Sequence, residues 1–281
     1  MSTALPELGL IPQTLLIPLV ARAEAPRHCP DLGFRDPWAE RLVATLEGDL
    51  EWVRHDAYAL RSCALRAQWI DRVASDFLKR HPQGLVLSLG AGLDARRARL
   101  TPVPAAAQWW ELDLPEVAEL RARILPAAAC GQSIAADAFD AEWLAQLPAQ
   151  AGQALLVIAE GLFMYIERER IEALCARLQQ RQQALAAPLE LCFDALHPWI
   201  VRRGMRMSSL RFRKDLRDRA SPFRSAVSGL AAAQRLLPGS RVQASLDLLE
   251  HCGGLVQFWS RLRARLVRDR PLYGLYHLLA R

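Results

Sequence analysis

Short apolar runs alternate with longer amphipathic segments through the middle of the chain. The runs that have the length of a strand cover residues 86–89, 109–113, 132–136, 154–159 and 189–194. The run at 154–159 is apolar throughout, which is typical of a central parallel strand that is buried on both faces. The repeated alternation of strand and helix predicts an α/β fold with a doubly wound, mostly parallel sheet.

The segments between these runs show the three- and four-residue spacing of helices with one apolar face. The clearest helix runs from Arg61 to Arg80 and ends at His81-Pro82-Gln83-Gly84. Arg66 lies at the border of its apolar face, so its guanidinium can point inward. Asp36 precedes Pro37 as the N-cap of another helix. Further helices are expected over residues 11–27, 95–100, 114–125, 140–147 and 167–183.

The last third of the chain gives a less regular pattern. Several helices are expected after His197, with a break at Pro238-Gly239 and a final strand over 275–279. With 281 residues, of which 52% are apolar, the chain can bury one substantial core. We expect three parts: an N-terminal helical cap over 1–81, a ligand-binding core over 82–200, and a basic part of the same domain over 201–281 that supplies the last strands.

Cysteine usage and hydropathy exclude several classes of protein. The six cysteines are scattered without a C-x-x-C pair or a histidine at ligand spacing, which favours buried free thiols over disulfides or a metal site. Pro18 interrupts the longest apolar stretch near the start, which is too short to span a bilayer, and no basic region precedes an apolar segment there. We therefore expect a cytoplasmic protein without a membrane partner.

Positive charge is concentrated in the basic part. From residue 200 onward, sixteen arginines and one lysine stand against five acids, an excess of 12, whereas the whole chain carries +6. Such asymmetry can indicate nucleic acid, an acidic partner protein, an anionic small molecule or a solvated helical surface. The arginines are dispersed among Leu, Ala and Asp and are not interleaved with exposed-looking aromatic residues. This favours the solvated surface and argues against nucleic acid.

A glycine turn and an acidic strand end indicate a nucleoside site. Gly90-Ala91-Gly92 follows the run at 86–89 directly, and the next run, which begins about twenty residues after Gly90, ends in Asp113. Glycines let the backbone turn sharply and approach a ligand closely, while a carboxylate at the tip of the second strand can accept both ribose hydroxyls. Glu160 ends the run at 154–159 and is expected at the same edge of the sheet.

The residues after the glycine turn bear on the kind of nucleoside. A dinucleotide site usually has a third glycine, here near Ala95, and a helix N-terminus that is free to hold phosphates. Asp94 occupies that entrance, and a carboxylate there would repel a pyrophosphate. S-adenosylmethionine, a nucleoside joined to a cationic sulfonium and an amino acid, therefore fits better than NAD.

Three blocks of this sequence resemble signature blocks of the leucine carboxyl methyltransferase family, and they cover residues 86–94, 110–117 and 158–165. The likeness is stronger to the bacterial branch of that family, the tetracenomycin methyltransferase-like O-methyltransferases of polyketide biosynthesis, and spans roughly residues 12–200. It implies a Rossmann-like class I methyltransferase sheet with an N-terminal helical cap, helical C-terminal additions and S-adenosyl-L-methionine as cofactor.

The resemblance also implies a set of cofactor-binding residues: Arg22, Arg66, Gly90, Gly92, Asp113, Asp137, Ala138 and Glu160. The two arginines would hold the methionine carboxylate, and Gly90 would lie beneath the cofactor. Asp113 would bind the ribose, Asp137 with Ala138 would contact the adenine, and Glu160 would face the ammonium or sulfonium. Two positions depart from the family, which usually has Thr-Arg at Ala95-Arg96 and often Leu at Ala138.

Each of these residues also has an ordinary structural interpretation. Arg66 could form a surface salt bridge with Asp71 or Glu51. Asp113 could cap the helix that begins at Pro115, and Glu160 could be a turn residue.

The expected activity is methylation of an oxygen by S-adenosylmethionine, with a carboxylate of a small polyketide-like secondary metabolite as acceptor. The basic part would cover the acceptor site and draw in an anionic substrate. The alternatives are a hydroxyl or phenol acceptor, an NAD-dependent oxidoreductase, and a non-catalytic protein that binds S-adenosylmethionine or an acidic partner. No catalytic side chain is assigned; the candidates are His197, at the carboxyl edge of the sheet, and Tyr165, whose ring is better explained by packing.

Overall fold

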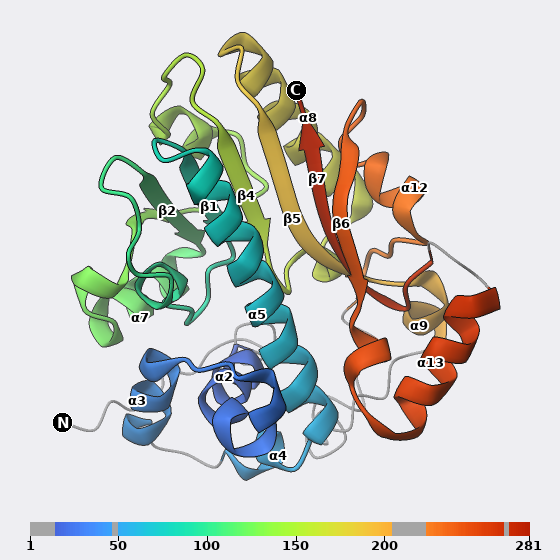
Figure 1. The fold of residues 1–281 in the computed structure, drawn as a ribbon. Coiled ribbons are helices and arrows are strands. Elements are labelled where there is room, and N and C mark those ends of the chain that lie inside the picture. The colour runs from blue at the N-terminus through green and yellow to red at the C-terminus, as the bar shows by residue number, and fades with distance from the viewer. Residues whose placement is uncertain (1–14, 47–49, 204–222, 267–269) are drawn as a thin grey trace.

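The computed structural model describes residues 15–46, 50–203, 223–266 and 270–281. Seven strands form one sheet in the order β3-β2-β1-β4-β5-β7-β6 (Figure 1). Their bounds are Leu85–Leu89 for β1, Gln108–Asp113 for β2, Gln132–Ala135 for β3, Leu155–Ala159 for β4, Leu189–Leu196 for β5, Arg241–Asp247 for β6 and Tyr273–Ala280 for β7. Strands β1 to β5 pair in parallel, and β7 runs antiparallel to both β5 and β6. The predicted doubly wound, mostly parallel sheet is confirmed.

The helices of the described residues are α2 Leu16–His28, α3 Pro37–Thr45, α4 Glu51–Arg54, α5 Ala57–Arg80, α6 Arg96–Arg99, α7 Pro115–Ile124, α8 Arg168–Ala184, α9 Pro198–Arg203, α12 Leu230–Gln234 and α13 Gly254–Leu266. Five 3₁₀ helices lie at Pro30–Leu32, Ala127–Ala129, Glu142–Gln146, Phe163–Tyr165 and Leu248–His251. The predicted N-cap is present at α3, where Asp36 Oδ1 accepts the N–H of Ala39 at 3.0 Å.

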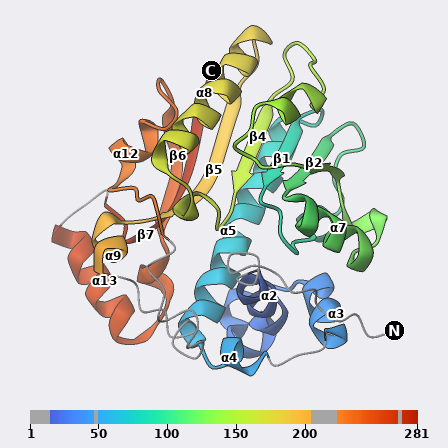
Figure 2. The same ribbon diagram turned by 180° about the vertical axis from the view of Figure 1, so that it is seen from behind.

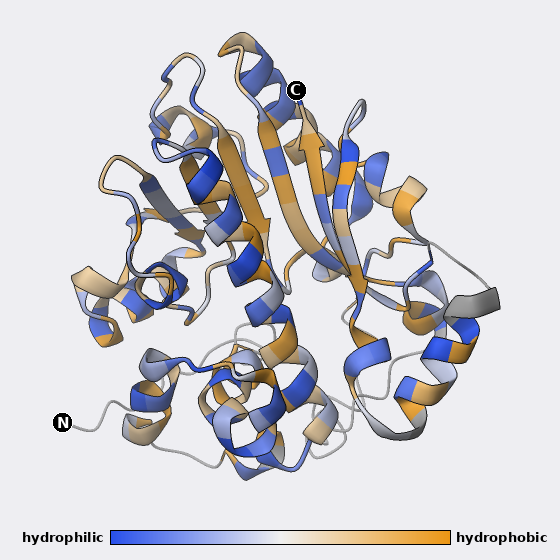
Figure 3. Cartoon of the chain, viewed as in Figure 1, coloured by the Kyte–Doolittle hydropathy of each residue, from blue (hydrophilic) through white to orange (hydrophobic). Residues whose placement is uncertain are grey.

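The two faces of the central strands pack against different helices. On β4, Leu156 and Ile158 pack with α5, while Leu155 and Val157 join the core that contains the buried face of α8. This alternation follows from the two-residue period of a strand, and it explains why the run is apolar throughout. Figure 3 shows β4 as apolar along its length, whereas β5 carries hydrophilic bands. The sheet therefore has one core on each side.

Helix α5 connects the N-terminal helices with the sheet. Its first half packs against α2, and its second half lies on β1 and β4 through Ile70, Val73 and Phe77. Figures 1 and 2 show α2, α3 and α4 grouped together below the carboxyl ends of the parallel strands. The chain thus carries a helical layer at the edge where open α/β folds bind their ligands.

Two details of the predicted elements are wrong. The helix expected from Asp140 through Leu147 is a short 3₁₀ turn without a side-chain cap. The helix expected over 95–100 is present as α6, although it is only one turn long. In the last third, β6 was not predicted, because its side chains are mostly exposed and its sequence has no strong apolar alternation. The break at Gly239 is present, with φ +77°, and the final strand spans 273–280. Residues 11–14 of the expected first helix lie outside the described part.

None of the helices in the described part of the chain is both long and apolar enough to cross a bilayer. Five of the six cysteines are buried, Cys130 is half-buried, and all six are free thiols.

Candidate functional site

The carboxyl ends of four neighbouring strands bring the predicted residues to one edge of the sheet. The glycine turn follows β1, Asp113 ends β2, Asp137 follows β3 and Glu160 follows β4. The parallel register places these ends side by side, since Leu89 pairs with Leu112 and Asp113 pairs with Ala135.

The glycine turn and the end of β2 form one unit. The N–H of Gly92 donates to Asp113 Oδ2 at 2.6 Å, and the N–H of Leu114 donates to Asp113 Oδ1 at 2.8 Å. Burial raises the pKa of the Asp113 carboxyl, and these two hydrogen bonds oppose the rise. Asp113 is therefore not the N-cap of α7; that position belongs to Leu114, which makes no side-chain cap. Each carboxylate oxygen keeps a lone pair for a hydroxyl donor.

Gly90 has φ +60°, a conformation that side chains with a Cβ rarely adopt. A Cβ at this position would lie 3.1 Å from Cδ1 of Leu162. The first glycine of the turn is thus required by the backbone and by the close approach of the loop after β4.

Arg66 points from α5 into the carboxyl edge. Its Nε donates to Glu160 Oε1 at 2.9 Å, and its Nη1 donates to Asp194 Oδ2 at 2.9 Å and to the hydroxyl of Tyr273 at 2.7 Å. Burial alone would lower the pKa of Arg66, but Tyr273, Asp194 and Glu160 together raise it well above its usual value. Arg66 therefore does not form the surface salt bridge to Asp71 or Glu51. Its partners are buried and come from two strand ends and β7.

Further arginines and acids extend these contacts into one buried set, which we call the ion network. Its members are Arg22, Arg66, Arg96, Arg99, Asp36, Asp71, Asp94, Glu160 and Asp194. Four formal positive charges meet five negative charges, so the network carries −1. Each side chain of the network is at most 13% exposed, which means that water contributes little to balancing this charge.

Arg22 joins the N-terminal helices to the ion network. Its Nε donates to Asp36 Oδ2 at 2.9 Å, and its Nη2 donates to the backbone carbonyl of Leu93, directly after the glycine turn, at 2.9 Å. Asp36 is at the same time the N-cap of α3 and a partner of Arg99 at 2.6 Å. The first basic residue that was expected at the cofactor therefore does lie beside the turn.

Asp94 was expected to present a negative charge to the entrance of the helix, but it lies among three guanidinium groups. Its carboxylate contacts Arg99 at 2.9 Å, Arg96 at 3.1 Å and Arg22 at 3.7 Å. Burial would raise the pKa of Asp94, but the three guanidiniums outweigh this and hold it well below its usual range. The carboxylate is thus neutralised within the network, and the four-residue α6 offers no extended helix N-terminus to phosphates.

Asp194 and Tyr273 are site residues that the sequence interpretation missed. Asp194 Oδ1 accepts the N–H of Gly161 at 2.5 Å, and its Oδ2 accepts both Arg66 and the Tyr273 hydroxyl, the latter at 2.8 Å. A signal for Asp194 existed, because it ends an apolar run in the same way as Glu160. Tyr273 had none, since nothing in the sequence indicates that β7 inserts beside β5.

The two residues expected at the adenine follow β3. Asp137 Oδ1 accepts the N–H of Phe139 at 2.9 Å, and its Oδ2 pairs with Arg170 at 2.9 Å. Ala138 is buried, and its carbonyl accepts the indole N–H of Trp143 at 3.1 Å. These contacts fix the shape of the loop at the carboxyl edge, and the adenine role of the two residues stays a prediction.

The two candidate catalytic residues differ in setting. His197 lies just beyond β5, and its Nδ1 accepts the N–H of Trp199 at 3.2 Å. Burial lowers the pKa of His197, and the guanidiniums of Arg263 and Arg270 lower it further. The ring of Tyr165 packs against Phe223, with ring centroids 5.5 Å apart.

A sequence profile described as leucine carboxyl methyltransferase matches residues 16–179, more than half of the chain. The chain belongs to the leucine carboxyl methyltransferase family. It is 31% identical to the tetracenomycin polyketide synthesis O-methyltransferase TcmP of Streptomyces glaucescens over 241 residues, which cover 85% of this chain and 83% of that protein.

Two further similarities concern a relative in sequence and a solved structure. The chain is 28% identical to the S-adenosyl-L-methionine-dependent methyltransferase dpfgK of Gibberella zeae over 195 residues, 65% of each protein. A solved structure from Thermobifida fusca YX, described as a methyltransferase, matches with a TM-score of 0.52 at 14% identity and covers 93% of this chain and 94% of its own, which supports the fold. The protein is an S-adenosylmethionine-dependent methyltransferase.

The residues at the carboxyl edge fit this cofactor. The methionine part of S-adenosylmethionine carries a sulfonium, an ammonium and a carboxylate, and its formal charge of +1 complements the −1 of the ion network. Asp113 offers fixed acceptors to ribose hydroxyls. Within the described residues, no group of three or more His, Cys, Asp or Glu side chains could hold a metal ion.

Proposed function

We propose that this methyltransferase transfers the methyl group to a carboxylate oxygen of a small, anionic, polyketide-like secondary metabolite. The observation that carries the proposal is the pairing of charges at the carboxyl edge. An acidic ion network suits the cationic donor, while Arg263 and Arg270 lie close enough to His197 to lower its pKa and so bring positive charge to the acceptor side. The name of the family and the polyketide role of TcmP support the same acceptor class.

The cofactor roles follow from where the side chains lie. Arg22 and Arg66 would hold the methionine carboxylate, since both guanidiniums reach the strand ends from the helical layer. Glu160 would face the ammonium or sulfonium. Burial would raise the pKa of Glu160, but the guanidiniums of Arg96 and Arg66 outweigh this and hold it below its usual value, so that it stays anionic. Asp113 would accept the ribose hydroxyls, and Gly90 and Gly92 would let the backbone approach the nucleoside.

Methyl transfer of this kind is an in-line displacement, and S-adenosylmethionine supplies a methyl group that is activated by its sulfonium. The protein's task is to align the two reactants and to exclude water. A carboxylate acceptor has a pKa of about 4 and arrives ionised, so it requires no base from the protein. This agrees with the described carboxyl edge, whose charged side chains are held in buried ion pairs.

Binding of the cofactor is tested by calorimetric titration of the purified chain with S-adenosylhomocysteine and, separately, with NADH. We expect binding of S-adenosylhomocysteine alone. Binding of NADH alone would contradict the assignment and favour an oxidoreductase.

The acceptor is tested with methyl-labelled S-adenosylmethionine and two matched aromatic compounds, a carboxylic acid and the corresponding phenol. A methyl ester releases methanol in mild alkali, whereas a methyl ether is stable. We expect the label on the carboxylic acid, and we expect mild alkali to release this label as methanol. Alkali-stable label on the phenol would establish the hydroxyl alternative. Cofactor binding without transfer to any acid or phenol would favour the non-catalytic alternative.

The anionic character of the acceptor is tested by ionic strength. The Debye length falls from about 10 Å at 0.1 M salt to about 3 Å at 1 M, so attraction by exposed arginines weakens. We expect the KM for the acceptor to rise steeply with salt while the affinity for S-adenosylhomocysteine changes little. A KM that is independent of salt would assign these arginines to solvated surface.

A further inference from the structure

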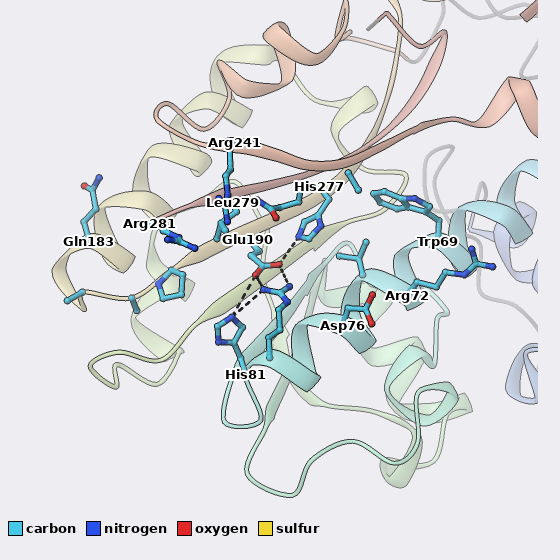
Figure 4. Close-up of a pocket in the computed structure, with 17 residues that line it drawn as sticks. Trp69, Arg72, Asp76, His81, Gln183, Glu190, Arg241, His277, Leu279 and Arg281 are labelled. Carbon is cyan, nitrogen blue, oxygen red and sulfur yellow. Dashed lines mark hydrogen bonds and ion pairs between the residues drawn. The ribbon is translucent and has the colours of Figure 1, made fainter. Parts of the chain in front are cut away.

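A second cavity lies toward the other end of the parallel strands, where β5 begins. It has a volume of about 1030 Å³ and lies between the second half of α5 and the same-side face of β5, β7 and β6 (Figure 4). Glu190 is the second residue of β5, whereas Asp194 and the ion network lie toward the other end of that strand. The cavity is therefore separate from the methyl-transfer site, although α5 and β5 contribute to both.

The buried acid of this cavity is already neutralised. Glu190 is 1% exposed and accepts two hydrogen bonds from Arg80, at 2.5 and 2.9 Å, and its Oε2 lies 2.7 Å from Nε2 of His277. Figure 4 shows these groups meeting at the centre of the cavity. The second acid of the lining, Asp76, pairs with Lys79 at 2.9 Å. Neither carboxylate is left to balance further positive charge.

The side chains of three arginines in the lining have no ion-pair partner among the residues that the structure describes. Arg72, Arg241 and Arg281 are exposed, and none of them forms a hydrogen bond or ion pair through its side chain within the described residues. Arg241 and Arg281 lie together at one end of the cavity in Figure 4, while Arg72 lies at the other. The cavity thus presents unbalanced guanidinium groups to any ligand that enters.

The wall between these ends is largely apolar. Leu279 lies across from Arg241 in the β6–β7 register, and Val73 and Trp69 line the side formed by α5. Side chains two residues apart on one face of a strand are separated by about 6.8 Å, so residues 277 to 281, which run to just beyond the end of β7, span about 14 Å. This length suits an elongated small molecule, and the volume is at the upper end of the range for small-molecule pockets.

We propose that this cavity binds a small amphipathic oxyanion, a carboxylate or phosphate attached to an aromatic or aliphatic body. The oxyanion would pair with Arg241 and Arg281, because guanidinium groups match carboxylate and phosphate oxygens in geometry and charge. The body would lie along Leu279 and Val73 toward Trp69. Such a ligand is distinct from the methyl acceptor, whose reacting oxygen must reach the carboxyl edge.

The test uses the full chain and three naphthalene probes: 1-naphthyl phosphate, 1-naphthoate and neutral 1-naphthol. We expect at least one anionic probe to bind at least tenfold more tightly than 1-naphthol, in calorimetric titration in the presence of saturating S-adenosylhomocysteine. A preference between the two anions distinguishes a phosphate from a carboxylate ligand. Equal affinity for 1-naphthol and the anions, or no binding at millimolar concentration, would overturn the proposal.

Two charge-reversal variants test whether the anionic probe binds in this cavity. Arg241→Glu should weaken binding of the anionic probe at least tenfold, whereas Arg235→Glu should not, because Arg235 is also exposed but does not line the cavity. Both positions are at the surface, so both variants should unfold at the temperature of the wild type. Loss of binding in both variants alike, or displacement of the probe by S-adenosylhomocysteine, would place the probe elsewhere and reject this site.

Discussion

Arg66 and Asp194 are 128 residues apart in the chain and form a buried hydrogen bond of 2.9 Å at the carboxyl edge of the sheet. The bond joins α5, which precedes the first strand, to β5, the last parallel strand. Because Glu160 and Tyr273 contact the same guanidinium, one side chain ties together α5, β5, β7 and the loop after β4. Arg66 is therefore structural as well as a candidate ligand of the cofactor.

Arg66→Ala should destabilise the protein as well as weaken cofactor binding. The substitution leaves Asp194 buried without an ion-pair partner and leaves Glu160 with Arg96 alone, and breaking a buried pair in this way costs about 3–5 kcal/mol. Urea unfolding measures this loss, and Lys79→Ala, on the exposed side of the same helix, is the control and should change stability by less than about 1 kcal/mol. Arg66→Lys keeps the charge and should retain more stability than the Ala variant. Wild-type stability in Arg66→Ala would show that the network tolerates unpaired acids.

Gly161→Ala should cost more stability than Gly152→Ala. Both glycines have positive φ, +64° and +74°, so both substitutions carry a backbone strain of about 1–2 kcal/mol. A Cβ on Gly161 would also lie 3.2 Å from Nη2 of Arg66, whereas a Cβ on Gly152 meets nothing within 4 Å. The difference between the two variants in urea unfolding, and a loss of S-adenosylhomocysteine affinity in Gly161→Ala alone, report the displacement of Arg66. Equal behaviour of the two variants would contradict this.

Asp113→Ala and Asp113→Asn should both weaken the binding of S-adenosylhomocysteine. The Ala variant loses every acceptor, and the Asn variant turns an amide donor toward one of the N–H groups of Gly92 and Leu114. Hydrogen bonds to a charged group are worth about 1.5–3 kcal/mol, so we expect a loss of about tenfold to a hundredfold, at least as large for Ala as for Asn. Glu116→Ala, in the exposed first turn of α7, is the control for calorimetry. Unchanged affinity in both variants would remove Asp113 from the ribose site.

His197→Ala should leave turnover of a carboxylate acceptor nearly intact, with a wild-type rate that stays flat from about pH 6 to 9. The reason is that an ionised acceptor needs no base. Since burial and the neighbouring arginines lower the pKa of His197, the imidazole is already neutral at pH 7 and is available as a base if the acceptor is a phenol. A hundredfold loss in the variant, with a wild-type rate that climbs through the histidine range, would favour that alternative. His28→Ala provides the matched histidine control.

Protonation of Glu190 should lower the free energy of unfolding at acid pH. Burial raises the pKa of its carboxyl, but the bonds from His277 and Arg80 outweigh this and hold it at about 2, below its usual 4.5. Because the folded-state pKa is depressed, the stabilisation is complete well above pH 4.5 and is lost as the pH falls toward 2. The shift corresponds to about 3 kcal/mol, of which about 2 kcal/mol should be gone at pH 3. The measurement is urea unfolding of wild type and Glu190→Gln at pH 7 and pH 3, and parallel pH dependence of the two proteins would contradict it.

The sequence predicted those parts of the fold and site that depend on local pattern. The parallel strands, the N-cap at Asp36 and the acidic strand ends at Asp113 and Glu160 follow from periodicity and turn chemistry. The place of Arg66 followed from the resemblance and from its position at the border of an apolar face. The partners of Asp94, the antiparallel insertion of β7 and the role of Tyr273 depend on contacts between distant segments, which no local pattern records.

The contact of Arg22 with the carbonyl of Leu93, and the double role of Asp36, have a consequence for engineering this enzyme. The N-terminal helices are not an exchangeable module, because their charges pair with groups that follow β1, at the carboxyl edge of the sheet. A chimera that takes residues 1–81 from a relative to alter acceptor choice must therefore carry matching charges at positions 22, 36, 66 and 71. Diversification of the acceptor is easier in the segments after β5, where a replacement would leave those four positions unchanged.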